Sequence, residues 1–144
     1  MVYKLFLDSD VLLDIILNRK PFVDQNLDLF SIRSDETALL FTSSSIIINT
    51  QYIGEKQIGR LHAKTGMKKL LNYLEIVNPA KDSILKAYAS NFTDIEDAIQ
   101  YFTALENDII DYFITRNIKD FKKNEAHLPV LTPSQFLKLP KQNS

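Results

Sequence analysis

The chain has 144 residues, of which 45% are apolar and 24% charged, a balance typical of one globular domain rather than of a disordered or fibrous protein. Cysteine is absent, which excludes disulfide bonds and thiolate zinc sites, and no apolar run approaches the roughly 20 residues that a membrane-spanning helix needs. The net charge of −1 implies that any contact with nucleic acid is local. We therefore expect a cytoplasmic protein, without a membrane anchor, in which any metal is held by oxygen ligands.

The first third of the chain predicts a strand, two helices and a second strand. Tyr3–Leu7 is a short apolar run stopped by an acid, as in a buried parallel strand, and we place it at the centre of the sheet. Apolar residues then recur at helical spacing from Ser9, and Pro21 ends that segment. A second helix is predicted over Phe22–Arg33, and the apolar run Thr37–Thr42 predicts the second strand.

The middle of the chain continues the alternation of helix and strand. Ser43 follows the second strand and offers a hydroxyl suited to capping a helix. Gln51–Leu74 is predicted to be helical with an interruption at one of its three glycines. Glu75–Asn78 before Pro79 has the pattern of a third strand, and Lys81–Ala89 that of a short helix.

The last third contains the clearest helix signal. Thr93 and Glu96 form a capping-box pattern ahead of apolar residues at helical spacing. Tyr112–Thr115 predicts a buried strand, and Thr132 followed by Pro133 predicts a last short helix. Strands that alternate with helices over residues 1–144 indicate a single α/β domain, with a parallel sheet that is covered by helices on both faces.

Acidic residues lie where the carboxyl ends of these strands should meet, which is where open α/β sheets bind their ligands. Asp8 ends the first strand, Asp97 lies in the first turn of the capped helix, and Asp120 follows the last predicted strand. Carboxylates held close together repel each other without a cation, and hard divalent ions prefer their oxygens. The three acids therefore predict a Mg²⁺ or Mn²⁺ site, at which a metal-activated water could attack a phosphodiester.

The sequence resembles a PIN domain, in particular the VapC-like ribonuclease toxins and their stand-alone relatives, over nearly the whole chain. The likeness rests on FLDSDVLLD at the first strand, on TDIEDAIQYFTALENDIIDYFITRNIKDF and on PVLTPSQFL. The resemblance implies a three-layer αβα PIN-like fold with a central parallel sheet of about five strands. It also implies an endoribonuclease that cleaves RNA, forms a homodimer and has an antitoxin protein as its partner, whereas the carboxylate chemistry alone would equally allow DNA.

Two acids of the family match this sequence residue by residue. The family's first acid falls on Asp8 and its helix acid on Asp97, within a DAxxxxxA pattern that runs to Ala104. The family's strand-end motif, T-R/N-D-x-D-F, reads TRNIKDF here. In this segment the second acid is kept as Asp120, and the first is replaced by Asn117.

A second departure falls on the helix after the second strand, where family members usually carry a glutamate and this chain has Asn49. Asparagine offers an amide oxygen but no charge, so the two replacements should weaken metal affinity. Asp94 lies three residues before Asp97 and could restore part of the missing charge, as could Asp10. Thr115 ends a strand on the same side, where its hydroxyl could bind a metal-bound water or cap the backbone.

Each of these residues also has a purely structural interpretation. Asp8 could be only a helix cap, and the helix dipole alone would favour an acid at Asp94 or Asp97. Asp120 could be an ordinary turn residue. Arg116 could bind phosphate, although a strand-end arginine is more often an ion-pair partner. A basic stripe at four-residue spacing could guide RNA or be a solvated helix face, and it consists of Lys56, Arg60, Lys64 and Lys68.

Two other functions stay open from the sequence. With Asn49 and Asn117 in place of acids, the domain could act only as an RNA- or protein-binding module, and metal binding at the three acids would distinguish the nuclease from it. The segment LFLDSDVLL also fits the DxD motif of haloacid-dehalogenase-type phosphatases, although 144 residues leave little room for that larger core.

Overall fold

A five-stranded parallel sheet forms the middle of the protein in the computed structural model, which describes residues 2–34, 37–122 and 127–140. The strand order is β3-β2-β1-β4-β5, so β1 lies at the centre, between β2 and β4. The strands are β1 (Tyr3–Leu7), β2 (Ala38–Thr42), β3 (Leu74–Ile76), β4 (Tyr112–Ile114) and β5 (Val130–Leu131). The parallel sheet of about five strands, with its first strand central, is thus confirmed.

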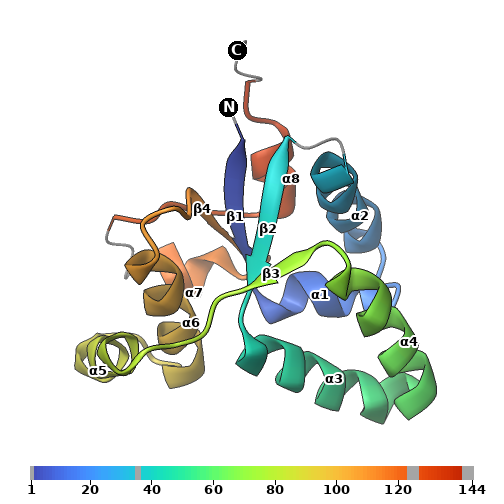
Figure 1. The fold of residues 1–144 in the computed structure, drawn as a ribbon, viewed down its shortest axis with the longest axis horizontal. Helices are drawn as coiled ribbons and strands as arrows, with labels where there is room; N and C mark the ends of the chain where they lie inside the picture. Colours follow the sequence, from blue (N-terminus) through green and yellow to red (C-terminus); the bar gives the residue numbers. More distant parts are fainter. Residues whose placement is uncertain (1, 35–36, 123–126, 141–144) are drawn as a thin grey trace.

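Helices flank this sheet on both faces. They are α1 (Ser9–Ile16), α2 (Phe22–Ser34), α3 (Ser44–Ile58), α4 (Arg60–Leu71), α5 (Lys81–Ala89), α6 (Ile95–Glu106), α7 (Ile118–Lys122) and α8 (Pro133–Leu137). Figure 1 shows α5, α6 and α7 on one side of the sheet and α1, α2 and α4 on the other. Within the ranges that the structure describes, no helix is both long and apolar enough to cross a membrane.

Aromatic packing fixes α6 and α7 against the end of the sheet that carries the acids. Phe121 of α7 is fully buried, with its ring centroid 4.7 Å from that of Phe113 in β4. Tyr101 of α6 is also fully buried and donates a hydrogen bond from its hydroxyl to the carbonyl of Leu128 at 2.9 Å. Burial of these large rings is among the strongest apolar contributions that a domain of this size makes. It holds α6 and α7 beside the end of β4, and the acids of both helices with them.

The start of α6 differs from the sequence prediction. Asp94, and not Thr93, is the N-cap, and its carboxylate accepts a hydrogen bond from the Asp97 backbone N–H at 3.1 Å. The helix therefore begins one residue later than the capping-box pattern indicated, which moves Glu96 too close to the cap to close a box. Aspartate caps helices at least as well as threonine, which explains the choice. The capping box predicted at Thr132 is confirmed.

Gly59 separates α3 from α4 in a backbone conformation that other residues rarely adopt, with φ 87° and ψ 157°. An added methyl group would meet no atom within 4 Å, so the cost of alanine there comes from the backbone alone. We expect Gly59→Ala to lower the free energy of unfolding by about 1–3 kcal/mol, measured by urea denaturation. Gly66→Ala is the control, because Gly66 lies inside α4 and alanine favours a helix interior. An equal loss of stability in both variants would contradict the backbone explanation.

Candidate active site

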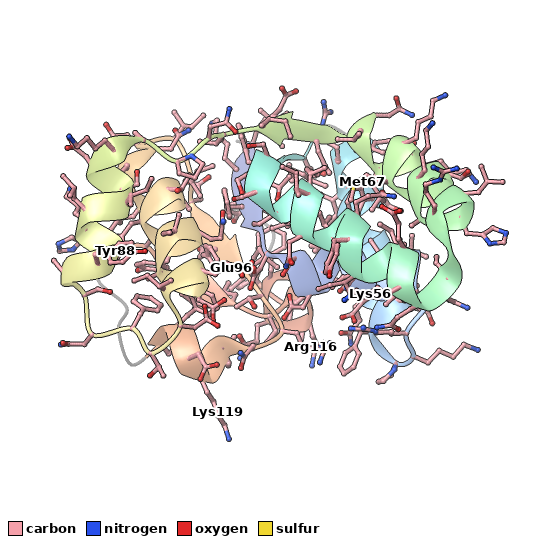
Figure 2. All side chains as sticks on the ribbon, turned by 90° about the horizontal axis from the view of Figure 1, so that it is seen from below. Lys56, Met67, Tyr88, Glu96, Arg116 and Lys119 are labelled. Atoms are coloured by element: carbon pink, nitrogen blue, oxygen red, sulfur yellow. The ribbon has the colours of Figure 1, made fainter. Side chains whose placement is uncertain are left out.

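Several of the predicted site residues lie at the carboxyl ends of the central strands or on the helices beside them. Asp8 follows β1, Thr115 follows β4, and Ser43 follows β2. Figure 2 looks at the molecule from the side on which β1 ends, and it places Glu96 of α6 and Arg116 on this face, between Tyr88 on one side and Met67 on the other. Open α/β sheets bind their ligands at this edge, so the candidate active site lies here.

Asp8 is both a helix cap and the centre of the acidic group. Its Oδ1 accepts a hydrogen bond from the Ser9 N–H at 2.8 Å, which caps α1, and its Oδ2 accepts one from the Thr115 hydroxyl at 2.9 Å. Burial, followed by the charges of Asp10 and Asp97, raises the pKa of Asp8 from 3.8 to about 8. Capping alone does not account for Asp8, because the protein by itself stabilises the charged form of this carboxylate poorly.

Thr115 joins Asp8 to a second acid of the same helix turn. Its hydroxyl lies 3.2 Å from Oδ2 of Asp10, and that oxygen also accepts a hydrogen bond from the Arg116 backbone N–H at 3.0 Å. The backbone N–H of Asn117 donates to the Thr115 hydroxyl at 3.2 Å. One fully buried threonine therefore fixes the distance between two carboxylates and ties both to β4.

The acids of α6 add charge from the opposite side. Asp97 is half-buried, and burial raises its pKa from 3.8 to about 7, with further contributions from the charges of Asp94, Asp120, Glu96 and Asp10. Asp94 is exposed and caps the helix, a role that the sequence pattern had indicated for Thr93. Acids from β1, α1, α6 and α7 thus lie within electrostatic reach of one another.

The two asparagines occupy different surroundings. Asn117 donates a hydrogen bond from its side-chain amide to Oδ2 of Asp120 at 2.7 Å, so a neutral donor stands where the family has a second like charge. Asp120 lies in the short helix α7 and not in a plain turn. Asn49 is half-buried in the second turn of α3, the helix that starts at the end of β2. This helix begins at the same edge of the sheet as the acids.

The donor set suits a hard divalent cation, although it is not closed around one. In the part of the chain that the structure describes, no three Asp, Glu or His side chains already form a group that could enclose an ion. The available ligands are nevertheless oxygens, and burial and mutual repulsion raise the pKa values of Asp8 and Asp97. Oδ1 of Asp10 is buried without a hydrogen-bond partner among the described residues. Such an atom is what a cation at this site would satisfy.

Arg116 is committed to an ion pair. It forms a bidentate contact with the fully buried Asp14, with distances of 3.0 Å and 3.1 Å, and its guanidinium lies 4.2 Å from the centre of the Phe22 ring. Arg19 is 3.5 Å from the same carboxylate, to which the Asn26 amide also lies close. The ion-pair interpretation of Arg116 is therefore confirmed, and no sequence pattern indicated that its partner lies 102 residues away.

Removal of this arginine should destabilise the fold, because the fully buried Asp14 would keep only the longer contact with Arg19, at 3.5 Å, as an ion pair. We expect Arg116→Met to lower the free energy of unfolding by about 2 kcal/mol or more, measured by urea denaturation near neutral pH. The control is Arg60→Met on the exposed face of α4, which should change stability by less than about 0.5 kcal/mol. Equal effects of the two variants would mean that the Asp14 pair does not contribute.

A second buried polar contact was also missed from the sequence. Gln100, one turn after Asp97, accepts a hydrogen bond from the Ser43 hydroxyl at 2.6 Å and donates one to Ser45 at 2.7 Å. Its signal was a polar residue on the buried face of α6, 3% exposed. The contact fastens α6 to the start of α3 and so sets how far Asp97 stands from the end of β2.

The basic stripe does not lie on one helix, because Gly59 ends α3 between its first two members. Lys56 belongs to α3 and lies 4.3 Å from the centre of the Tyr52 ring, and the other three belong to α4. All four side chains are exposed. They form two basic surfaces at different angles rather than one continuous track.

Comparison with known proteins agrees with this geometry. Residues 4–119 match the PIN domain family, and the chain is 30% identical over 138 residues to ribonuclease VapC1 of Aquifex aeolicus, with 92% of each chain covered. The chain therefore belongs to the PIN-domain family, among its VapC-like members. The family resemblance seen in the sequence is confirmed.

The fold is also shared with solved VapC structures. One is a chain of the VapBC2 complex of Rickettsia felis bound to a promoter DNA fragment, with TM-score 0.70, 17% identity, and coverage of 90% of this chain and 98% of that chain. Another is VapC20 of Mycobacterium tuberculosis, a toxin that cleaves the sarcin-ricin loop, with TM-score 0.65, 10% identity, and coverage of 86% and 98%. At these identities the structures support the fold alone.

Proposed function

We propose that this protein is a VapC-type endoribonuclease that hydrolyses RNA phosphodiester bonds with Mg²⁺ or Mn²⁺ held by Asp8, Asp97 and Asp120. The observation that carries the proposal is the convergence of Asp8 and Asp97 from β1 and α6, with a pKa of about 8 and about 7 respectively. Carboxylates whose pKa values are raised this far by burial and by neighbouring charges are expected at functional sites. The ribonuclease name of the relative at 30% identity points to the same reaction.

Each residue of the proposed site would have a separate role. A bound divalent ion would lower the pKa of a water and balance the charge on the scissile phosphate. Thr115 holds Asp8 in place through its hydroxyl, and Asn117 orients the Asp120 carboxylate through its amide. Asp94 adds negative charge beside Asp97 while it caps α6. Asn49 would contribute an uncharged oxygen from α3.

The partner that we propose is an antitoxin protein, with the toxin acting in the cytoplasm as a homodimer. The support comes from solved structures of similar fold that are complexes. They include the VapBC2 complex of Rickettsia felis and a toxin–antitoxin complex from Klebsiella pneumoniae, the latter with TM-score 0.64 and 23% identity. Size-exclusion chromatography with light scattering, on the chain alone and with its genomic neighbour, tests both associations.

Calorimetry with Mn²⁺ and Mg²⁺ on the wild type and on Asp97→Asn tests the metal site, followed by cleavage of mixed RNA and DNA pools with each metal and with a chelator. We expect binding by the wild type, its loss in Asp97→Asn, and cleavage of RNA only when metal is present. Asp28→Asn, an exposed acid of α2, is the matched control and should behave like the wild type.

A second function is favoured by one specific observation, the neutral Asn49 and Asn117 at two positions where the family carries acids. If the protein binds RNA at millimolar metal but does not cleave it, the binding module replaces the nuclease. If neither metal nor RNA binds, the site as proposed is wrong.

A further inference from the structure

Asp10, which the sequence indicated could restore part of the missing charge, lies beside the proposed metal ligands. It lies in the first turn of α1, and its Oδ2 shares the Thr115 hydroxyl with Asp8 and also accepts the Arg116 N–H. The two carboxylates are thus held on one hydroxyl group, with Asp10 fixed by hydrogen bonds from Thr115 and Arg116, the two residues that follow β4.

The other oxygen of Asp10 has no such partner. Oδ1 is buried and accepts no hydrogen bond from the described residues. A buried carboxylate oxygen without a donor is costly, and native proteins keep such atoms chiefly where a ligand, water or ion completes them. Because Oδ2 already accepts hydrogen bonds from Thr115 and Arg116, Oδ1 is the oxygen of Asp10 that can bind a ligand.

The neighbouring acids are less suited to supply the missing charge. The Asp94 carboxylate is directed at its own helix, where it caps the Asp97 N–H, and Asp94 is exposed. Asp120 is exposed and accepts the amide of Asn117. Asp10 alone combines a second hydrogen bond to the threonine that holds Asp8 with a buried, unpartnered oxygen.

The residue that holds Asp10 in place is itself anchored by several contacts. The residue whose backbone N–H holds it, Arg116, is itself anchored by the bidentate pair with buried Asp14 and by the Phe22 ring. A ligand fixed in this way loses little freedom when an ion binds, and such preorganisation is what a strong metal site requires.

We propose that Asp10 is an additional ligand of the divalent cation, through Oδ1, and supplies the negative charge that Asn49 and Asn117 do not. The inference rests on the proposed function. It adds Asp10 to Asp8, Asp97 and Asp120 as a ligand, and favours it over Asp94, which the sequence also offered as a source of charge.

Mn²⁺ binding by Asp10→Asn, measured by calorimetry and by the metal-induced rise in melting temperature, tests the assignment. The amide oxygen can keep the hydrogen bonds from Arg116 and Thr115, which leaves the NH₂ group, a poor ligand, at the position of Oδ1. We expect Mn²⁺ affinity to fall by roughly tenfold or more, since ligand charge sets affinity at such sites. The metal-free melting temperature should stay the same or rise, because a like charge beside Asp8 is removed. Asp28→Asn, which also removes one charge, should keep the wild-type affinity.

The possible results distinguish failure of this inference from failure of the proposed function. A lower metal-free melting temperature with unchanged Mn²⁺ affinity would make Asp10 a structural residue and overturn the inference. Asp10→Ser, which keeps a hydroxyl for the Arg116 N–H, should also lose affinity, and its circular dichroism spectrum checks that the fold persists. If Asp8→Asn abolishes binding and both Asp10 variants keep it, this inference fails and the proposed function stands. If the wild type binds no metal, both fail.

Discussion

Replacement of Asp8 by asparagine is expected to abolish metal-dependent RNA cleavage while the fold stays intact. Asparagine is as good an N-cap as aspartate, so the hydrogen bond from Ser9 that starts α1 can be kept. What is lost is the charge, on the residue that links β1, Thr115 and the acids of α6. Loss of a partner behind a metal ligand costs about 10–100-fold, so we expect loss of this proposed ligand to reduce the cleavage rate by at least ~100-fold.

Rates with saturating Mn²⁺ or Mg²⁺ on one RNA substrate, together with urea denaturation of the metal-free proteins, measure both parts of this expectation. Asp28→Asn controls for the loss of one negative charge, and Asp8→Ala separates charge from capping, since only alanine also removes the cap. Cleavage by Asp8→Asn at the wild-type rate would show that the reaction takes place elsewhere on the molecule.

The metal-free protein is expected to lose stability as the pH rises from about 4 to about 8. In the folded state burial and neighbouring charges raise the pKa of Asp8 to about 8 and that of Asp97 to about 7, from 3.8. The folded state therefore binds these protons more tightly than the unfolded chain does. The resulting stabilisation is complete below the unfolded pKa and is lost as the pH passes through the folded values, by up to about 1.4 kcal/mol per pH unit for each proton released.

Urea denaturation with a chelator across this pH range measures the loss directly. Saturating Mn²⁺ should reverse it, because a cation that binds the charged carboxylates stabilises the folded state most where they are deprotonated. Asp8→Asn should show a flatter dependence on pH than the wild type. Equal slopes in the two proteins would mean that Asp8 is charged in the folded state without a cation.

Local sequence patterns predicted most of the strands and helices that carry the site residues. Tyr3–Leu7 has the continuous apolar character of a strand buried on both faces, and the acid that stops it had to lie at the end of that strand. The helix over Ile95–Glu106 has a clear apolar periodicity, so only its cap was misplaced, by one residue. The two-residue strand β5 has too few residues for a periodic signal, and only the family resemblance anticipated a fifth strand.

The contacts that complete the site could not be predicted, because they join residues far apart in sequence. Thr115 meets Asp8 across 107 positions and Ser43 meets Gln100 across 57. Each of these side chains looks like an ordinary polar residue until the strands pair and bring it beside its partner. For Asp10 the sequence predicted a possible role as added charge, but its contact with the hydroxyl that Asp8 also uses, 105 positions away, could not be predicted.

The strand order carries a consequence for the synthesis of this protein on the ribosome. β1 is made first, yet its partner on the catalytic side is β4, with Leu5 paired to Tyr112. A growing chain can pair β1 with β2 early, but Thr115 and the acid of α7 do not exist until most of the protein has been translated. The nascent chain thus carries Asp8 without the residues that complete its surroundings.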